Sequence, residues 1–204
     1  MFQKAGVRLI GHRGFTPLAP ENSLPSFECA GRLGLWAIET DVRRTKDGEL
    51  VCLHDERVDS QYNGQGAVAG MTRAELGKLR IRVGNRLECY GEDQLGIPLF
   101  GQYLDICAQY GAVAFIETKT DDVEQVLAQA QKRLPAWQVV ISSCNFSHLL
   151  AARRACPGIF VHHIFSDMAY LPALAELNNS GMSLDIRRRE LVPDGLTEKV
   201  HSQG

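Results

Sequence analysis

Short apolar runs of strand length alternate with longer amphipathic stretches along this chain of 204 residues. A short run that is apolar on both faces is typical of a buried parallel strand, and seven such runs are present. They are Val7–Ile10, Trp36–Val42, Glu49–Leu53, Ala112–Ile116, Gln138–Ser142, Gly158–Ile164 and Met182–Ile186. Helical periodicity or capping signals predict helices at Asn22–Leu33, Thr72–Arg80, Phe100–Tyr110, Asp121–Leu134, Ser147–Ala155 and Asp167–Leu177.

Strands that alternate with helices form parallel sheets with right-handed crossovers. The pattern therefore predicts an α/β fold, a TIM-type (β/α) barrel. A doubly wound sheet is disfavoured because the chain has no Gly-rich dinucleotide fingerprint. The stretch 56–96, which is polar and Gly-rich, is too long for a plain loop and predicts a small insertion after the third strand. We expect one domain over residues 1–204 with this insertion inside it.

The predicted strands number one fewer than the eight of a closed barrel. Only 18 residues follow Ile186, and they predict a loop and a helix at Val192–Gln203, so the eighth strand is expected to be missing. An open barrel would leave unpaired backbone groups on its first and last strands. We therefore expect either that Val192–Gly204 packs into the gap or that a second copy of the chain covers the open edge, as a homodimer.

Composition excludes several classes of protein. Lys and Arg total 22 against 24 Asp and Glu, a net charge of −2, so a nucleic-acid-binding surface is not expected. The apolar runs are too short to span a bilayer, and the amino terminus lacks the apolar segment of a secretory signal, which predicts a cytoplasmic location. The six cysteines show no CxxC spacing, which predicts reduced thiols rather than a zinc site.

Polar residues gather where the predicted strands end. Four such clusters are Gly11-His12-Arg13-Gly14, Glu39-Thr40-Asp41, His54-Asp55 and Glu117-Thr118-Lys119. The carboxyl ends of barrel strands carry the active site, so a barrel would bring all four clusters to one mouth.

Glu39 and Asp41 are two residues apart on a strand and therefore point to the same face. Carboxylates that converge repel one another unless a cation or a proton lies between them. With Glu117, they form an all-oxygen set of the kind that binds Mg²⁺ or Ca²⁺. A rim of salt bridges, with Glu39 paired to Arg13 and Glu117 to Lys119, is the structural alternative.

Two histidines favour the functional interpretation. His12 and His54 each lie at a strand end beside the acidic residues, and such a pair is the minimum for general acid–base chemistry near neutral pH. Arg13 and Lys119 add fixed positive charge, which suits a phosphate group. Each histidine alone would more often be structural.

The order of these motifs resembles the amino-terminal signature of the glycerophosphodiester phosphodiesterase family. The matching segments are Gly11-His12-Arg13-Gly14, Pro20-Glu21-Asn22-Ser23, Ile38-Glu39-x-Asp41-Val42, Thr45-x-Asp47-Gly48 and His54-Asp55, followed by Phe115–Lys119 and Val140–Ser143. The likeness covers about residues 7–196, and its first block is highly specific.

The resemblance implies a metal-dependent hydrolase on a (β/α)₈ barrel that cleaves glycerophosphodiesters to glycerol 3-phosphate and an alcohol. The motif positions imply the following roles: Glu39, Asp41 and Glu117 hold one divalent cation, Mg²⁺ or Ca²⁺; His12 and His54 form the acid–base pair; Arg13 and Lys119 contact the phosphate; Asn22 orients the site. The resemblance does not say which histidine is the acid.

Two alternatives stay open. A related barrel phosphodiesterase acting on lysophospholipids would use the same histidines, but it should have an apolar entrance for an acyl chain. A truncated form, weakly active or inactive, would share the motifs as well. The insertion lacks an Arg-Thr-Thr-like run common in relatives and has Asp59–Gly64 there, so the preferred alcohol is undetermined.

Overall fold

The computed structural model describes residues 7–164, 171–177 and 180–183. The strands are β1 (Ile10–Gly11), β2 (Ala37–Arg44), β3 (Leu50–Cys52), β4 (Val113–Thr118), β5 (Val139–Ser143), β6 (Phe160–Ile164) and β7 (Ser180–Ser183). The helices are α1 (Leu24–Arg32), α2 (Arg73–Leu76), α3 (Phe100–Tyr110), α4 (Val123–Gln131), α5 (Phe146–Ala155) and α6 (Leu171–Glu176). Four short 3₁₀ turns lie at Val58–Ser60, Val68–Gly70, Leu87–Cys89 and Ala136–Gln138.

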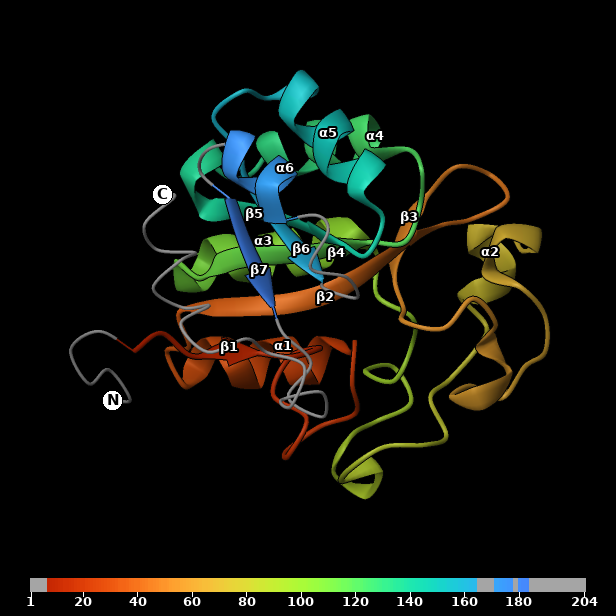
Figure 1. Ribbon diagram of the computed structural model, residues 1–204. Coiled ribbons are helices and arrows are strands. Elements are labelled where there is room, and N and C mark those ends of the chain that lie inside the picture. The colour runs from red at the N-terminus through yellow and green to blue at the C-terminus, as the bar shows by residue number, and fades with distance from the viewer. Residues whose placement is uncertain (1–6, 165–170, 178–179, 184–204) are drawn as a thin grey trace, which may run out of the picture.

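A curled sheet forms the centre of the molecule (Figure 1). Its strands follow the order β1-β2-β4-β5-β6-β7, and each neighbouring pair in this order is parallel. Helices connect successive strands and pack on the sheet. This is the arrangement of a TIM-type (β/α) barrel that is open in the described part of the chain, and it confirms the predicted fold class.

The prediction for Glu49–Leu53 was wrong in direction. This segment becomes β3, which is antiparallel to β2 and pairs with its last three residues. The loop Thr45–Glu49 is too short for the crossover that a parallel pair needs, so β2 and β3 form a hairpin. The described residues therefore contain six parallel strands and not seven. The expectation for Val192–Gly204 falls outside the described residues.

Side chains alternate strictly between the two faces of the sheet. The face toward the helices carries apolar residues such as Ile38, Val42 and Ile116, which belong to the main core cluster with Phe27, Phe100 and Tyr103 among others. The opposite face has a small apolar cluster near the amino ends of the strands, centred on Ala37, Val113 and Val140. Toward the carboxyl ends this inner face becomes polar.

Local signals fix the ends of the helices. Ser23 caps α1 in a reciprocal pair with Ser26, and α3 ends at Gly111, whose φ of 64° is easy for glycine. Thr72 and Glu75 form the predicted capping box at the start of α2. That helix stops at Leu76, so the predicted extension toward Arg80 was wrong.

The insertion lies to one side of the sheet, on the right in Figure 1. It has a hydrophobic cluster of its own, separate from the main core: Val51, Leu53, Val58, Tyr62, Val68, Leu76, Ile81, Leu95 and Ile97. Val51 and Leu53 belong to β3 and its end, so the hairpin anchors the insertion to the sheet. None of the described helices is both long and apolar enough to cross a bilayer.

Helices α1 and α3 approach each other closely at Gly31. A Cβ atom added there would overlap the ring of Tyr110, whose hydroxyl donates to Glu28 Oε2 at 2.6 Å and so holds the ring in place. Gly31→Ala should therefore lower the free energy of unfolding by about 1–3 kcal/mol, although alanine favours helices.

Gly158→Ala is the matched control, because a Cβ atom at that position would meet nothing within 4 Å. Its stability should stay within about 0.5 kcal/mol of the wild type. Urea unfolding of both variants tests this packing. If Gly31→Ala is as stable as the wild type, α1 and α3 must be far enough apart to hold the added Cβ atom.

Candidate active site

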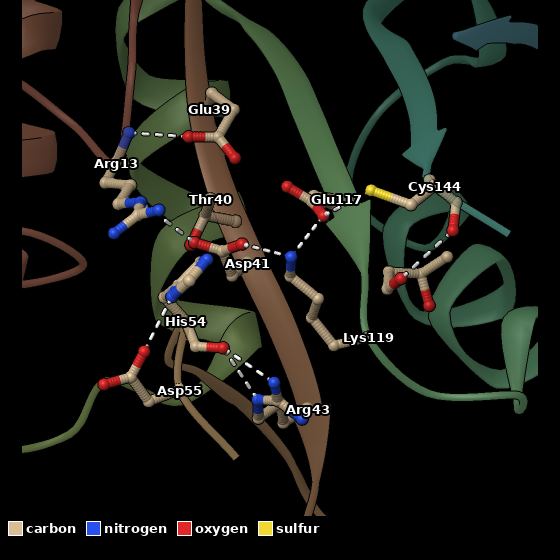
Figure 2. A network of polar contacts seen from close by, with 12 residues as sticks. Arg13, Glu39, Thr40, Asp41, Arg43, His54, Asp55, Glu117, Lys119 and Cys144 are labelled. Carbon is tan, nitrogen blue, oxygen red and sulfur yellow. Dashed lines mark hydrogen bonds and ion pairs between the residues drawn. The ribbon is translucent and has the colours of Figure 1, made fainter. Parts of the chain in front are cut away.

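Three carboxylates meet on the inner face of the sheet (Figure 2). Asp41 of β2 is the direct cross-strand partner of Glu117 of β4, and Glu39 lies two residues earlier on the same face. One oxygen from each side chain lies within 4.8 Å of the other two, and all three residues are buried. The spacing of Glu39 and Asp41 on one strand, together with the β2–β4 register, produces this cluster.

Burial and mutual repulsion disfavour three negative charges at this place. Burial, then the neighbouring Asp41, raises the pKa of Glu39 to about 8. Burial also raises the pKa of Glu117. Asp41 Oδ1 is buried and accepts no hydrogen bond, although Lys119 Nζ lies 3.4 Å away. The three carboxylates are hard oxygen ligands whose negative charge is only partly compensated, and Asp41 Oδ1 is an acceptor without a donor. Both features fit a site for a divalent cation.

The loop after β1 wraps the cluster from one side. Arg13 has a φ of 56°, and this left-handed backbone turns its N–H toward Glu39 Oε2 at 2.6 Å. Its guanidinium donates to both carboxylate oxygens of Glu21, at 2.9 and 3.0 Å, and lies 3.5 Å from Asp41 Oδ2. The predicted phosphate-binding residue therefore lies beside the acidic cluster.

Asn22, for which the resemblance implies an orienting role, is completely buried and hydrogen-bonded to Asp41. Its side-chain N–H donates to Asp41 Oδ2 at 2.9 Å, and its oxygen accepts from the Thr40 hydroxyl at 2.8 Å. Asn22 also has a left-handed backbone, with a φ of 47°. Asparagine tolerates this conformation better than most residues, so both its backbone and its amide suit the position.

The β2–β3 hairpin brings His54 to the same mouth. β2 runs past the cluster, and β3 returns antiparallel, so that Leu53 N–H donates to the Asp41 carbonyl at 3.0 Å. His54 Nδ1 lies 2.8 Å from Asp55 Oδ1. Hydrogen bonds from Ser60 and then His54 lower the pKa of Asp55, so Asp55 is an acceptor at neutral pH and Nδ1 carries the proton. In the neutral ring, Nε2 is then the acceptor nitrogen of His54.

His12 and Lys119 complete the predicted set. Partial burial, then the charge of Arg13, lowers the pKa of His12, which favours a neutral ring at pH 7. Lys119 Nζ donates to Glu117 Oε1. Burial opposes the charged form of Lys119, but the hydrogen bond to Glu117 and the nearby carboxylates raise its pKa overall.

Two cavities are each lined by residues of the site, and their linings share no residue. The first, of about 450 Å³, is called the His12 cavity and is lined by His12, Thr16, Ala19, Glu21, Asp55, Ser60, Gln61, Val83, Gly84 and Asn85. The second, of about 340 Å³, is called the Lys119 cavity and is lined by Arg43, Arg44, Thr45, Lys46, Glu56, Val68, Ala69, Lys119, Thr120 and Asp121.

Sequence reasoning gave no role to several residues of the site. Arg43 donates twice to the His54 carbonyl, at 3.0 and 2.7 Å, and thereby holds the hairpin end. Glu21 pairs with Arg13. Glu21 belongs to one of the motifs quoted from the sequence and Arg43 to none, and nothing in the spacing of either residue indicated these partners.

Two further histidines, His162 and His148, take part in polar contacts. His162 continues the inner row of the sheet next to Ser142, whose hydroxyl lies 3.0 Å from its Nδ1, and burial lowers the pKa of His162 to about 4. His148 of α5 is only 8% exposed, and its Nδ1 lies 3.0 Å from Ser143 Oγ and its Nε2 2.8 Å from Asp121 Oδ1.

Comparison with known proteins agrees with this geometry. The profile of the glycerophosphoryl diester phosphodiesterase family matches residues 12–186. The chain belongs to this family. The matched segment contains every residue predicted for the site, from His12 to Lys119, and the resemblance seen in the sequence is confirmed.

Curated members of the family are similar in sequence. A glycerophosphodiester phosphodiesterase of Caldanaerobacter subterraneus is 34% identical over 157 residues, which is 73% of this chain and 63% of that protein. One from Bacillus subtilis is 31% identical over 170 residues, 75% of this chain and 57% of that protein. This chain thus spans about six tenths of the length of these relatives.

A solved structure is similar over almost the whole chain. The phosphodiesterase of Oleispira antarctica, determined in complex with its product sn-glycerol-3-phosphate, aligns with a TM-score of 0.76 and 25% identity, over 97% of this chain and 90% of that one. A glycerophosphodiester phosphodiesterase of Agrobacterium tumefaciens, 22% identical, aligns with a TM-score of 0.79 over 97% of this chain and 83% of that one, and shows the shared fold.

The metal-free protein should become less stable as the pH rises from about 5 to 8. The pKa of Glu39 is about 8 in the folded state against an ordinary value of 4.5, so the folded state holds the extra proton through this window. The free energy of unfolding then falls by up to about 1.4 kcal/mol per pH unit. Urea unfolding in a chelator at several pH values measures this slope.

Glu39→Gln is the control, because glutamine cannot ionise. Its slope over the same window should be at most half that of the wild type, with Glu117 contributing the remainder. Equal slopes in the two proteins would show that Glu39 ionises normally in the folded state.

Proposed function

We propose that this chain hydrolyses glycerophosphodiesters to glycerol 3-phosphate and an alcohol, with one divalent cation and two histidines at the mouth of the barrel. The observation that carries the proposal is the convergence of Glu39, Asp41 and Glu117 beside His12 and His54. Family membership and the product bound to the Oleispira antarctica phosphodiesterase support the substrate class.

The cation, Mg²⁺ or Ca²⁺, is proposed to bind Glu39, Asp41 and Glu117. When bound, it would offset the negative charge of the phosphoryl oxygens and of the three carboxylates. Asn22 orients Asp41 for this role, and the backbone N–H of Arg13 orients Glu39. The guanidinium of Arg13 and the ammonium of Lys119 add positive charge where the phosphate would lie.

His12 and His54 are proposed to move the protons of the reaction. The lowered pKa of His12 suits a general base, which takes the proton of the attacking hydroxyl, either of water or of the adjacent glycerol hydroxyl. The oxygen attacks phosphorus, the bond from phosphorus to the alcohol oxygen breaks, and that oxygen takes a proton. If the glycerol hydroxyl is the nucleophile, a cyclic phosphate forms, and water then opens it to glycerol 3-phosphate. His54 is assigned as the donor, because the Asp55 carboxylate accepts from Nδ1 and so fixes the orientation of the ring.

The lysophospholipid alternative finds no support in the described residues. An acyl chain needs an apolar entrance, whereas seven of the ten residues that line the His12 cavity are polar or charged. A homodimer through the sheet edges and a cytoplasmic location stay predictions.

Release of glycerol 3-phosphate from glycerophosphocholine should require a divalent cation. Excess EDTA should abolish the reaction, and Mg²⁺ or Ca²⁺ should restore it. Glu39→Gln should lower kcat/KM at least about 100-fold, because it removes one proposed ligand of the charge-compensating ion. Its metal-free melting temperature at pH 8 should equal or exceed that of the wild type, since one repelling group is gone. Full activity in EDTA would contradict the metal requirement.

His12→Ala and His54→Ala should each lower kcat by about 10²–10⁴-fold, the usual contribution of a positioned acid or base. Both should melt near the wild-type temperature, since both side chains lie at the solvent-facing mouth. His148→Asn is the matched control for loss of a buried histidine network: it should lower the melting temperature while kcat changes little. Near wild-type turnover in either alanine variant would make that histidine structural.

A further inference from the structure

The two cavities differ in the charged side chains that line them. The described lining of the His12 cavity includes two carboxylates, Glu21 and Asp55, and neither lysine nor arginine. The described lining of the Lys119 cavity includes four cationic side chains, two on β2 and one on each of the loops after β2 and β4, against two acidic ones. A diester whose phosphorus lies at the cluster would therefore meet different electrostatics on its two sides.

Both carboxylates of the His12 cavity have lone pairs that a ligand can still use. Hydrogen bonds from Ser60 and His54 lower the pKa of Asp55, and Glu21 is bound by one nitrogen of Arg13. Each bonded oxygen of an ionised carboxylate has a second lone pair. The partners therefore fix the positions of the two carboxylates, while lone pairs on the carboxylate oxygens can still accept hydrogen bonds from a ligand.

Two amides in the lining add to this excess of acceptors. Gln61 donates an N–H to the Glu21 carbonyl at 3.1 Å, and Asn85 donates an N–H to the Thr16 carbonyl at 2.8 Å. These bonds occupy amide nitrogens and leave the side-chain oxygens as acceptors. A wall of acceptors with negative charge suits a ligand that carries several N–H donors and a positive charge.

The shape of the cation is also constrained. A quaternary ammonium group has no N–H to donate, and proteins usually bind it with a cage of aromatic rings. Neither phenylalanine, tyrosine nor tryptophan is among the described residues that line the His12 cavity. A primary ammonium group, in contrast, can donate three hydrogen bonds to carboxylate and amide oxygens.

We propose that the His12 cavity receives the leaving alcohol and selects alcohols that carry a primary ammonium group, of which ethanolamine is the simplest. This inference rests on the proposed function, which it extends from a reaction to a preferred class of substrate. The cationic side chains that line the Lys119 cavity would repel an ammonium group, so the ammonium end of the diester is expected in the His12 cavity.

The test compares kcat/KM for glycerophosphoethanolamine, glycerophosphocholine and glycerophosphoglycerol at one metal concentration and one ionic strength. The ethanolamine ester should exceed the neutral glycerol ester by about five- to tenfold, the contribution of a hydrogen-bonded charge pair open to solvent. The choline ester, which has the charge but no N–H donor, should fall below the ethanolamine ester. Equal values for the three esters, or a preference for choline, would overturn the inference.

A charge placed on the cavity wall sharpens the test. Val83 lines the cavity and is 59% exposed, so it can be replaced with little cost to the fold. Val83→Lys should reduce the ratio of ethanolamine to glycerol ester by about fivefold, whereas Val83→Gln, of similar length without charge, should preserve it. Gln131→Lys, at an exposed position at the end of α4, adds the same charge elsewhere and should also preserve the ratio.

The ratio of kcat/KM for two esters, measured on the same variant, does not change if the variant loses activity equally toward both. A Val83→Lys variant that slows all three esters equally would therefore contradict the inference. If the wild type hydrolyses none of the esters, the proposed function fails. In that event, the dissociation constants of the three intact esters, measured by calorimetry on the wild type, decide the inference, with the same order expected.

Discussion

Repulsion among three buried carboxylates is the constraint around which the rest of the site is arranged. Glu39, Asp41 and Glu117 come together because β2 and β4 are adjacent, parallel and in register at Asp41 and Glu117. A sheet of this kind would ordinarily place apolar side chains there. The surrounding chain instead supplies the Arg13 backbone N–H, the Asn22 amide and the Lys119 ammonium, each aimed at one carboxylate. Even so, the pKa of Glu39 is about 8, which shows that these donors compensate only part of the negative charge of the cluster.

The same constraint explains the unusual backbone near the site. Arg13 and Asn22 both have positive φ values, and both use this conformation to deliver a donor to the acidic cluster. Strain of this kind persists where the surrounding structure enforces it. The β2–β3 hairpin serves a related purpose, because it returns the chain to Asp41 and leaves His54 at the mouth. The proposed metal ligands Glu39 and Asp41, the Asn22 amide that contacts Asp41 and the proposed acid His54 thus all depend on one strand, β2.

Much of this arrangement could be predicted from the sequence, because it depends on periodicity. The i, i+2 spacing placed Glu39 and Asp41 on one face, and Gly111 marked the end of α3. The direction of β3 could not be read from its apolar run, since strand direction depends on the loop before it. Partners such as Glu21 for Arg13, or Arg43 for the His54 carbonyl, depend on how loops meet in space, and no spacing along the chain encodes them. The burial of His148 depends in the same way on Asp121 in a neighbouring loop.

The central claim is that the charge missing from this cluster is that of a divalent cation. Anomalous X-ray scattering from crystals soaked in Mn²⁺ tests it most directly, because the signal locates the ion without reference to activity. The account predicts one strong peak about 2.0–2.4 Å from oxygens of Glu39, Asp41 and Glu117, and none at that place in Glu39→Gln crystals. A wild-type crystal with Mn²⁺ at other sites, and with only the Lys119 ammonium between the three carboxylates, would contradict it.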